Sequence, residues 1–193
     1  MITGHFGLAS AVKSQERFVP LWALMLATVW LDIIFIPLLL ADVETIEDAP
    51  GTDGGYGNAI IHADYTHSLI GAAVIAIVTG LLVAGWWGRR GGIVIGVVVL
   101  SHWVLDLIVH REDLPLLPGN VGDVRVGLGL WKVEWASIAF EAALLLVGAF
   151  LYWRAARAVE RGDGGNGAKR ADLVTGLIVA SGIVVLVADV LAA

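Results

Sequence analysis

The sequence predicts an all-α integral membrane protein: a bundle of about five transmembrane helices that forms one domain over residues 1–193. Composition is the first observation behind this prediction. Hydrophobic residues make up 58% of the chain and charged residues 16%, whereas a soluble domain has about half and about a quarter. The second observation is a mean hydropathy of +0.83, which comes from long uncharged runs. This excess does not fit inside one small soluble core.

Five apolar runs are long enough to cross a bilayer, whose hydrocarbon core of about 30 Å requires roughly 20 helical residues. They lie at about residues 18–40, 66–87, 91–110, 133–153 and 172–192. The first run follows basic residues as a signal peptide would, but it is longer than a signal peptide and contains Asp32. We therefore interpret it as a retained span. Residues 1–12 are apolar but too few to span, and they predict a re-entrant or interfacial helix.

The distribution of basic residues predicts the orientation of these spans. Nine of the twelve lie on one predicted side: Lys13, Arg17, Arg89, Arg90, Arg154, Arg157, Arg161, Lys169 and Arg170. The positive-inside rule makes this side cytoplasmic, so the N-terminus is expected inside the cell and the C-terminus outside. The protein would thus be a multi-pass protein of the inner (plasma) membrane. The net charge of −6 counts against nucleic acid as a partner, and the oligomeric state stays open.

The segment SHWVLDLIVH in the third run contains the clearest candidate site. His102, Asp106 and His110 are spaced four residues apart, so they share one face of a helix. Imidazole nitrogens and carboxylate oxygens at this spacing can hold a divalent metal such as zinc. The alternative is a polar stripe that joins helices by hydrogen bonds. Because ionisable groups inside a membrane are costly and usually functional, three aligned ligands favour a metal.

Depth along the helices places three carboxylates at one level. With a rise of about 1.5 Å per residue, Asp32, Asp106 and Glu141 each lie roughly 20 Å above the cytoplasmic end of their span. Cations gathered between them would neutralise charges that are expensive one by one in hydrocarbon. The alternative is three carboxylates that are satisfied separately.

The remaining histidines are candidate metal ligands, and their predicted positions suit this role to different degrees. The segment HADYTHSLIG supplies His62 and His67, of which His67 falls inside the predicted helix and is the better candidate. His62 is either a ligand, an outer partner of one, or a water-exposed group. His5 comes within reach of His102 if the first twelve residues re-enter the membrane, and it is only an interfacial histidine if they lie flat.

The segments GHFGLASA, WLD at residues 30–32, HADYTHS and SHWVLDLIVH together resemble the LexA-binding, inner-membrane-associated hydrolases, also described as membrane-bound metal-dependent hydrolases. The resemblance extends from His5 to about His110. The family has a PD-x-D pattern where this chain has WLD, so a second carboxylate is not matched there. The family is distantly similar to zinc-dependent phospholipases C and single-strand nucleases. The resemblance thus implies a cluster of divalent ions, with zinc the leading candidate, and hydrolysis of phosphoesters; we expect one to three ions.

By this resemblance, one metal would be held by Asp32, His67, His102 and Asp106, and Asp106 would bridge to a second metal bound by His5. Depth and alignment add His110 and Glu141, which would support a third metal or transfer the proton of the attacking water. The expected function is a metal-dependent hydrolase in the lipid bilayer, acting on a phospholipid or another phosphoester. The alternatives are a metal-ion or proton transporter that uses the same cluster, and a structural or regulatory membrane protein.

Overall fold

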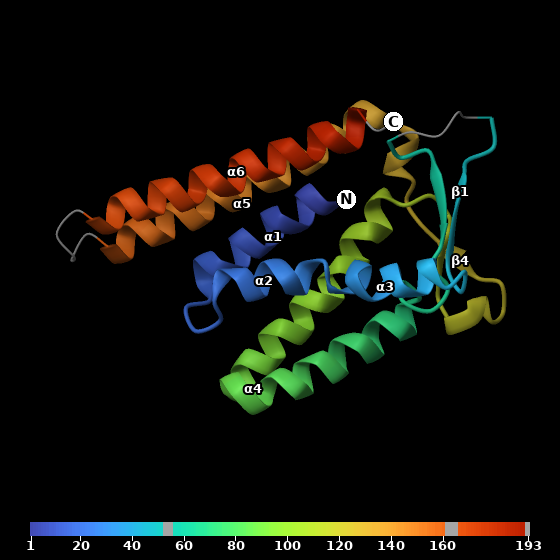
Figure 1. Ribbon diagram of the computed structural model, residues 1–193, viewed down its shortest axis with the longest axis horizontal. Coiled ribbons are helices and arrows are strands. Elements are labelled where there is room, and N and C mark those ends of the chain that lie inside the picture. Colours follow the sequence, from blue (N-terminus) through green and yellow to red (C-terminus); the bar gives the residue numbers. More distant parts are fainter. Residues whose placement is uncertain (52–55, 161–165, 192–193) are drawn as a thin grey trace.

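The computed structural model describes residues 1–51, 56–160 and 166–191 (Figure 1). Six α-helices account for most of this part of the chain. They are α1 (Ile2–Gln15), α2 (Leu21–Thr28), α3 (Trp30–Leu40), α4 (Leu69–Val109), α5 (Glu134–Glu160) and α6 (Asn166–Leu191). Short strands and 3-10 turns lie in the connections: β1 (Thr45–Asp48), β2 (Ala59–His62), β3 (Leu114–Pro115), η1 (Pro118–Asn120), β4 (Arg125–Val126) and η2 (Leu130–Lys132).

Three of these helices are long and apolar enough to cross a membrane. The qualifying stretches are Leu69–Val109, Glu134–Val159 and Gly167–Leu191, and α2 with α3 makes a fourth if this bent pair counts as one span. The structure therefore confirms a helical protein with membrane-length apolar helices. A polypeptide in hydrocarbon must pair its own backbone groups, and helices do so within one segment.

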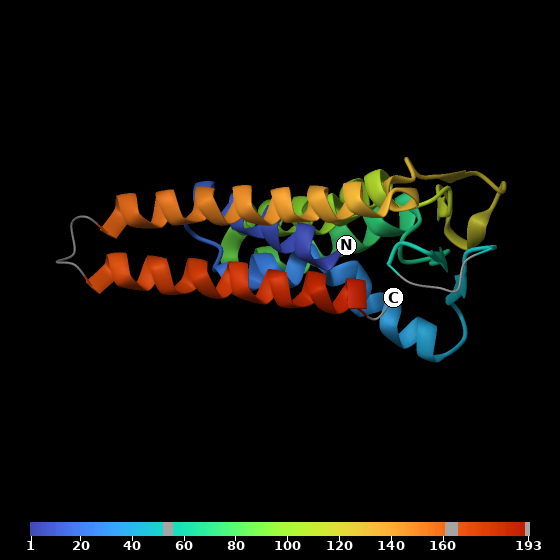
Figure 2. The same ribbon diagram turned by 90° about the horizontal axis from the view of Figure 1, so that it is seen from above.

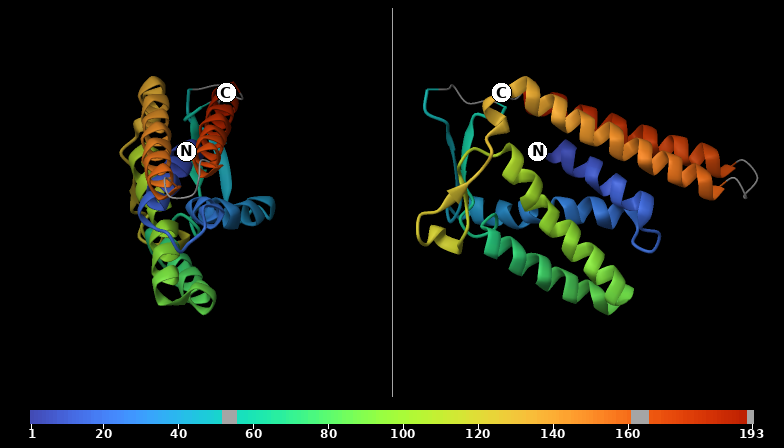
Figure 3. Two further views of the ribbon diagram at one scale, coloured as in Figure 1. Left: turned by 90° about the vertical axis from the view of Figure 1, so that its left-hand side faces the viewer. Right: turned by 180° about the vertical axis from the view of Figure 1, so that it is seen from behind.

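Helix α4 consists of two arms that fold back on each other at Trp87 and Gly88 (Figure 3). Gly88 has a φ of 68°, a conformation that glycine adopts without steric cost. Small residues face each other between the arms, since a Cβ added to Gly80 would lie 2.8 Å from the carbonyl oxygen of Gly92. Close approach at small residues is typical of helix pairs in lipid. The two arms correspond to the apolar runs predicted at 66–87 and 91–110.

The apolar run at 18–40 is one stretch in sequence but two helices in the structure. Val29 leaves the helical conformation (φ −114°, ψ 16°), and α2 and α3 meet there at a bend of 47°. Pro37 lies farther along, inside α3, so the bend does not coincide with the residue that usually breaks helices. A break of this kind leaves backbone carbonyls free to accept side-chain donors.

Helix α1 is enclosed by other helices instead of lying apart from them. It packs mainly on α5 and also contacts α2, α6 and α4, and Figure 2 shows it beside the antiparallel pair of α5 and α6. Its buried residues include Thr3, Gly4, His5 and Gly7, and the Thr3 hydroxyl donates a hydrogen bond of 3.0 Å to the Gly182 carbonyl on α6. The N-terminal segment thus carries His5 into the bundle.

The predicted all-α fold is confirmed for most of the described chain, and the two long connections differ from it because they contain short strands. β1 pairs antiparallel with β2 in the connection after α3, and β3 pairs antiparallel with β4 inside the connection at 112–131. Both hairpins lie at the end of the bundle where α3 and α4 end (Figure 1). Backbone groups outside the helices still need partners, and these short ladders supply them.

Candidate metal centre

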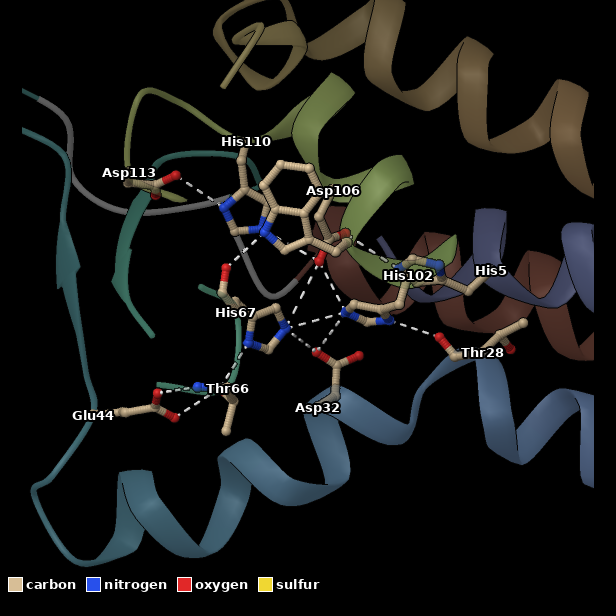
Figure 4. Close-up of polar contacts among 11 residues, drawn as sticks. His5, Thr28, Asp32, Glu44, Thr66, His67, His102, Asp106, His110 and Asp113 are labelled. Carbon is tan, nitrogen blue, oxygen red and sulfur yellow. Dashed lines mark hydrogen bonds and ion pairs between the residues drawn. The ribbon is translucent and has the colours of Figure 1, made fainter. Parts of the chain in front are cut away.

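Side chains from four segments converge where α1, the bend between α2 and α3, and the second arm of α4 meet (Figure 4). We call this group the His/Asp cluster: His5 on α1, Asp32 on α3, His67 just before α4, and His102 and Asp106 on α4. The Nε2 atoms of His67 and His102 are 3.1 Å apart. Asp32 Oδ1 lies 3.4 Å from each of these two nitrogens. All five residues are among those predicted as metal ligands.

Asp106 lies between His5 on one side and His67 with His102 on the other. Its Oδ2 is 2.9 Å from His102 Nε2 and 3.8 Å from His67 Nε2, while its Oδ1 is 3.2 Å from His5 Nε2. The His5 ring is also stacked on the His102 ring, with centroids 4.0 Å apart. The placement of α1 inside the bundle therefore brings His5 within reach of His102, as expected for a re-entrant segment.

The cluster is buried except on the side of Asp32. The side chains of His5, His67, His102 and Asp106 are at most 5% exposed, whereas that of Asp32 is 38% exposed. Asp32 is therefore the most accessible member of the cluster.

The hydrogen bond of His102 to the broken helix fixes where its lone pair points. His102 Nδ1 lies 2.6 Å from the carbonyl oxygen of Thr28, the last residue of α2. A carbonyl only accepts, so Nδ1 must donate, and the neutral ring then carries its lone pair on Nε2. Nε2 faces the carboxylates of Asp32 and Asp106, at 3.4 and 2.9 Å. In the neutral ring this nitrogen offers a lone pair to a cation, and in the protonated ring it donates to the carboxylates instead.

The separations fit a tetrahedral metal site. Metal–ligand bonds of about 2.1 Å at tetrahedral angles put neighbouring ligand atoms about 3.4 Å apart. Asp32 Oδ1, His67 Nε2 and His102 Nε2 lie 3.1–3.4 Å from one another, and Asp106 Oδ2 lies 2.9 Å from His102 Nε2 and 3.8 Å from His67 Nε2. Imidazole nitrogens and carboxylate oxygens are ligands of divalent cations, and the two carboxylates would match the charge of such an ion. The residues present therefore fit such a group.

His110 borders the cluster and has its own partner. Its Nδ1 is 3.0 Å from Asp113 Oδ1, while its Nε2 is 3.9 Å from Asp106 Oδ2. Asp113 is held in turn by the backbone N–H of Ile61 at 3.0 Å. An ionised carboxylate accepts only, so His110 donates from Nδ1 and turns its Nε2 toward Asp106.

Glu141 contacts other residues than the cluster. It is fully buried on α5 and accepts hydrogen bonds from the backbone N–H of Gly4 at 3.2 Å and from the hydroxyl of Tyr56 at 2.5 Å. Burial, together with the Glu141 carboxylate, raises the pKa of Tyr56, so this phenol stays a donor. These contacts attach α1 and the connection near Tyr56 to α5.

His62 also lies outside the cluster. It belongs to β2, where its Nδ1 is 3.1 Å from an Arg125 guanidinium nitrogen and its Nε2 is 3.8 Å from Glu47. The Arg125 guanidinium can only donate, so the Nδ1 lone pair of His62 is already used for a bond between the two hairpins.

Sequence reasoning missed the partners that orient the histidines. They are Thr28 at the helix break, Asp113 after α4, and Thr66 with Glu44 beside His67 (Figure 4). Thr66 belongs to the THS segment, which was the only signal in the sequence for any of them. Glu44 and Asp113 lie in connections outside the predicted spans, and they are 0% and 2% exposed.

Comparisons with known proteins reveal one partial likeness. No protein-family model and no solved structure matches the chain. A triacylglyceride transporter of Mycolicibacterium smegmatis is 30% identical over an alignment of 93 residues, and the match covers 39% of this chain and 17% of the transporter. The chain therefore matches less than a fifth of that protein's length.

Proposed function

We propose that this protein is a metal-dependent hydrolase embedded in the membrane, and that it cleaves a phosphoester such as a phospholipid. The observation that carries the proposal is the convergence of the Asp32 and Asp106 carboxylates and of His67 Nε2 on His102 Nε2, at 2.9 to 3.4 Å. The reaction class follows from the resemblance of the sequence motifs to the LexA-binding, inner-membrane-associated hydrolases. Asp32, His67, His102 and Asp106 would hold zinc, and His5 with Asp106 Oδ1 would hold a second ion.

Each residue of the cluster has a distinct task in this proposal. A divalent cation supplies Lewis-acid chemistry, which polarises a phosphoryl oxygen and makes water a better nucleophile at neutral pH. Asp32 is the exposed member and marks the side from which a phosphoester would enter. His110 can accept a proton at Nε2, because its Nδ1 donates to the Asp113 carboxylate. The contacts of Glu141 favour His110 over Glu141 for this role.

The metal content of the purified protein tests this proposal. We expect one to three zinc ions per chain by element analysis of gently purified protein. His110→Asn should retain most of this zinc but lose hydrolysis of phospholipid in mixed micelles. It removes the proton acceptor and leaves the four proposed zinc ligands intact. His62→Asn is a matched control that should change neither quantity. Wild-type protein without stoichiometric metal would contradict the proposal.

A transporter is the second candidate, favoured by the partial likeness to the triacylglyceride transporter. A transit site must open alternately to both sides of a membrane, whereas four of the five cluster side chains are enclosed. Liposomes loaded with a zinc-sensitive dye separate the two functions. Zinc flux without phospholipid hydrolysis would favour the transporter, and hydrolysis without flux would favour the enzyme.

We also propose five spans, formed by the bent pair α2 and α3, the two arms of α4, α5 and α6, with a cytoplasmic N-terminus. The basic residues support this orientation. A reporter fused after Ala193 should therefore lie outside the cell, and one inserted at Gly164, outside the described residues, should lie in the cytoplasm. Both reporters in one compartment would contradict the five-span topology.

A further inference from the structure

A buried carboxylate lies behind the cluster, on the far side of His67. Glu44, just before β1, is fully buried. Its Oε1 accepts the backbone N–H groups of Tyr65 and Thr66, each at 2.8 Å, and its Oε2 is 2.8 Å from the Thr66 hydroxyl. The same hydroxyl is 2.9 Å from His67 Nδ1. Figure 4 shows the resulting chain from Glu44 through Thr66 to His67.

The directions of these hydrogen bonds follow from which groups have hydrogens to give. Backbone N–H groups only donate, so Glu44 Oε1 accepts from Tyr65 and Thr66. The single hydrogen of the Thr66 hydroxyl points to Glu44 Oε2. The Thr66 oxygen therefore presents a lone pair to His67, and His67 must donate from Nδ1. The lone pair of the neutral ring is then on Nε2.

We propose that Glu44 and Thr66 are positioning residues that fix His67 in the Nδ1–H form and aim its Nε2 lone pair at the cation. This inference rests on the metal site of the proposed function. It explains why two imidazole nitrogens face each other at 3.1 Å: both His67 and His102 carry lone pairs there, and a cation between them removes the repulsion. We call the hydrogen-bonded chain from Glu44 through Thr66 to His67 the relay. Without the relay, His67 would carry its hydrogen on Nε2 and donate it to His102, and no lone pair of His67 would be left for a cation.

The relay also places a carboxylate behind His67, whereas no carboxylate lies behind His102. The outer partner of His102 is a neutral backbone carbonyl, whereas the chain behind His67 ends in a carboxylate. A carboxylate behind a metal-binding histidine makes the ring more basic, and loss of such partners typically lowers metal affinity about 10–100-fold.

Reversal of the relay gives the sharpest test. In Glu44→Gln the side-chain carbonyl still accepts the two backbone N–H groups, but its NH₂ group donates to the Thr66 oxygen. The Thr66 hydrogen then turns to His67 Nδ1, and the ring hydrogen moves to Nε2. Long-range ¹⁵N–¹H NMR of zinc-free protein should show His67 in the Nδ1–H form in the wild type and in the Nε2–H form in Glu44→Gln. The same form in both proteins would overturn the proposal.

Zinc affinity provides the second measurement, by competition with a chelator. Thr66→Val keeps the shape but deletes the hydroxyl, and it should weaken zinc binding about 10–100-fold. Thr66→Ser keeps the hydroxyl and should bind zinc like the wild type. If Thr66→Val also bound zinc like the wild type, the relay would be wrong while the metal site stood. If the wild-type protein bound no zinc at all, the proposed function itself would fail.

Discussion

Asp106→Asn is expected to lose most of the bound metal and any hydrolytic activity. Asp106 approaches four histidines, with His5 at 3.2 Å from Oδ1 and His102, His67 and His110 at 2.9, 3.8 and 3.9 Å from Oδ2. Asparagine keeps the size and one acceptor oxygen but removes half of the negative charge in the tetrahedral set. Because Asp106 contacts His5 as well as His67 and His102, the loss of metal affinity should exceed the roughly 10–100-fold typical of a residue that only orients a ligand.

Element analysis of the purified variant measures this loss directly. Asp172→Asn is the matched control, since Asp172 is an exposed aspartate on α6 that pairs with Arg157. It should bind as much zinc as the wild type. Equal zinc in Asp106→Asn and the wild type would refute the metal site. The cluster would then only hold helices together, with a protonated His102 Nε2 that donates to the carboxylates of Asp32 on α3 and Asp106 on α4.

Much of the site could be predicted because the helical rise fixes depth. Counting residues from the cytoplasmic ends placed Asp32 and Asp106 at one level, and in the structure both carboxylates lie within 3.4 Å of His102 Nε2. The same count placed Glu141 at that level, yet Glu141 contacts Gly4 and Tyr56. Depth is one coordinate of three, and the direction of a side chain around its helix depends on packing that a hydropathy profile does not contain.

The orienting partners could not be predicted, because their burial depends on tertiary contacts. Glu44 lies in an acidic connection, a composition typical of solvent-exposed loops. It is buried only because the backbone N–H groups of Tyr65 and Thr66, some twenty residues away, converge on it. The bend at Val29 gave no sequence signal either, although it frees the Thr28 carbonyl that orients His102.

The second large effect is expected where α1 packs on α5. A Cβ added to Gly148 would overlap the carbonyl oxygen of Gly7, and one added to Gly7 would overlap the backbone of Leu144. The obstacles are backbone atoms, which no rotamer change can move aside. Close backbone contact at small residues holds such helix pairs together in lipid, so the position of His5 depends on the absence of two side chains.

Gly148→Ala should therefore destabilise the protein, although alanine favours a helix interior over glycine by about 1 kcal/mol. Overpacking of a tight contact typically costs about 1–3 kcal/mol, which exceeds this gain and gives the expected sign. Gly176→Ala on α6 is the matched control, because a Cβ there meets nothing within 4 Å, and its melting temperature should equal or exceed that of the wild type. A melting temperature of Gly148→Ala at or above the wild type would contradict the tight packing. As α1 moves outward it takes His5 away from Asp106, so any zinc held by that pair should be lost before the zinc held by Asp32, His67 and His102.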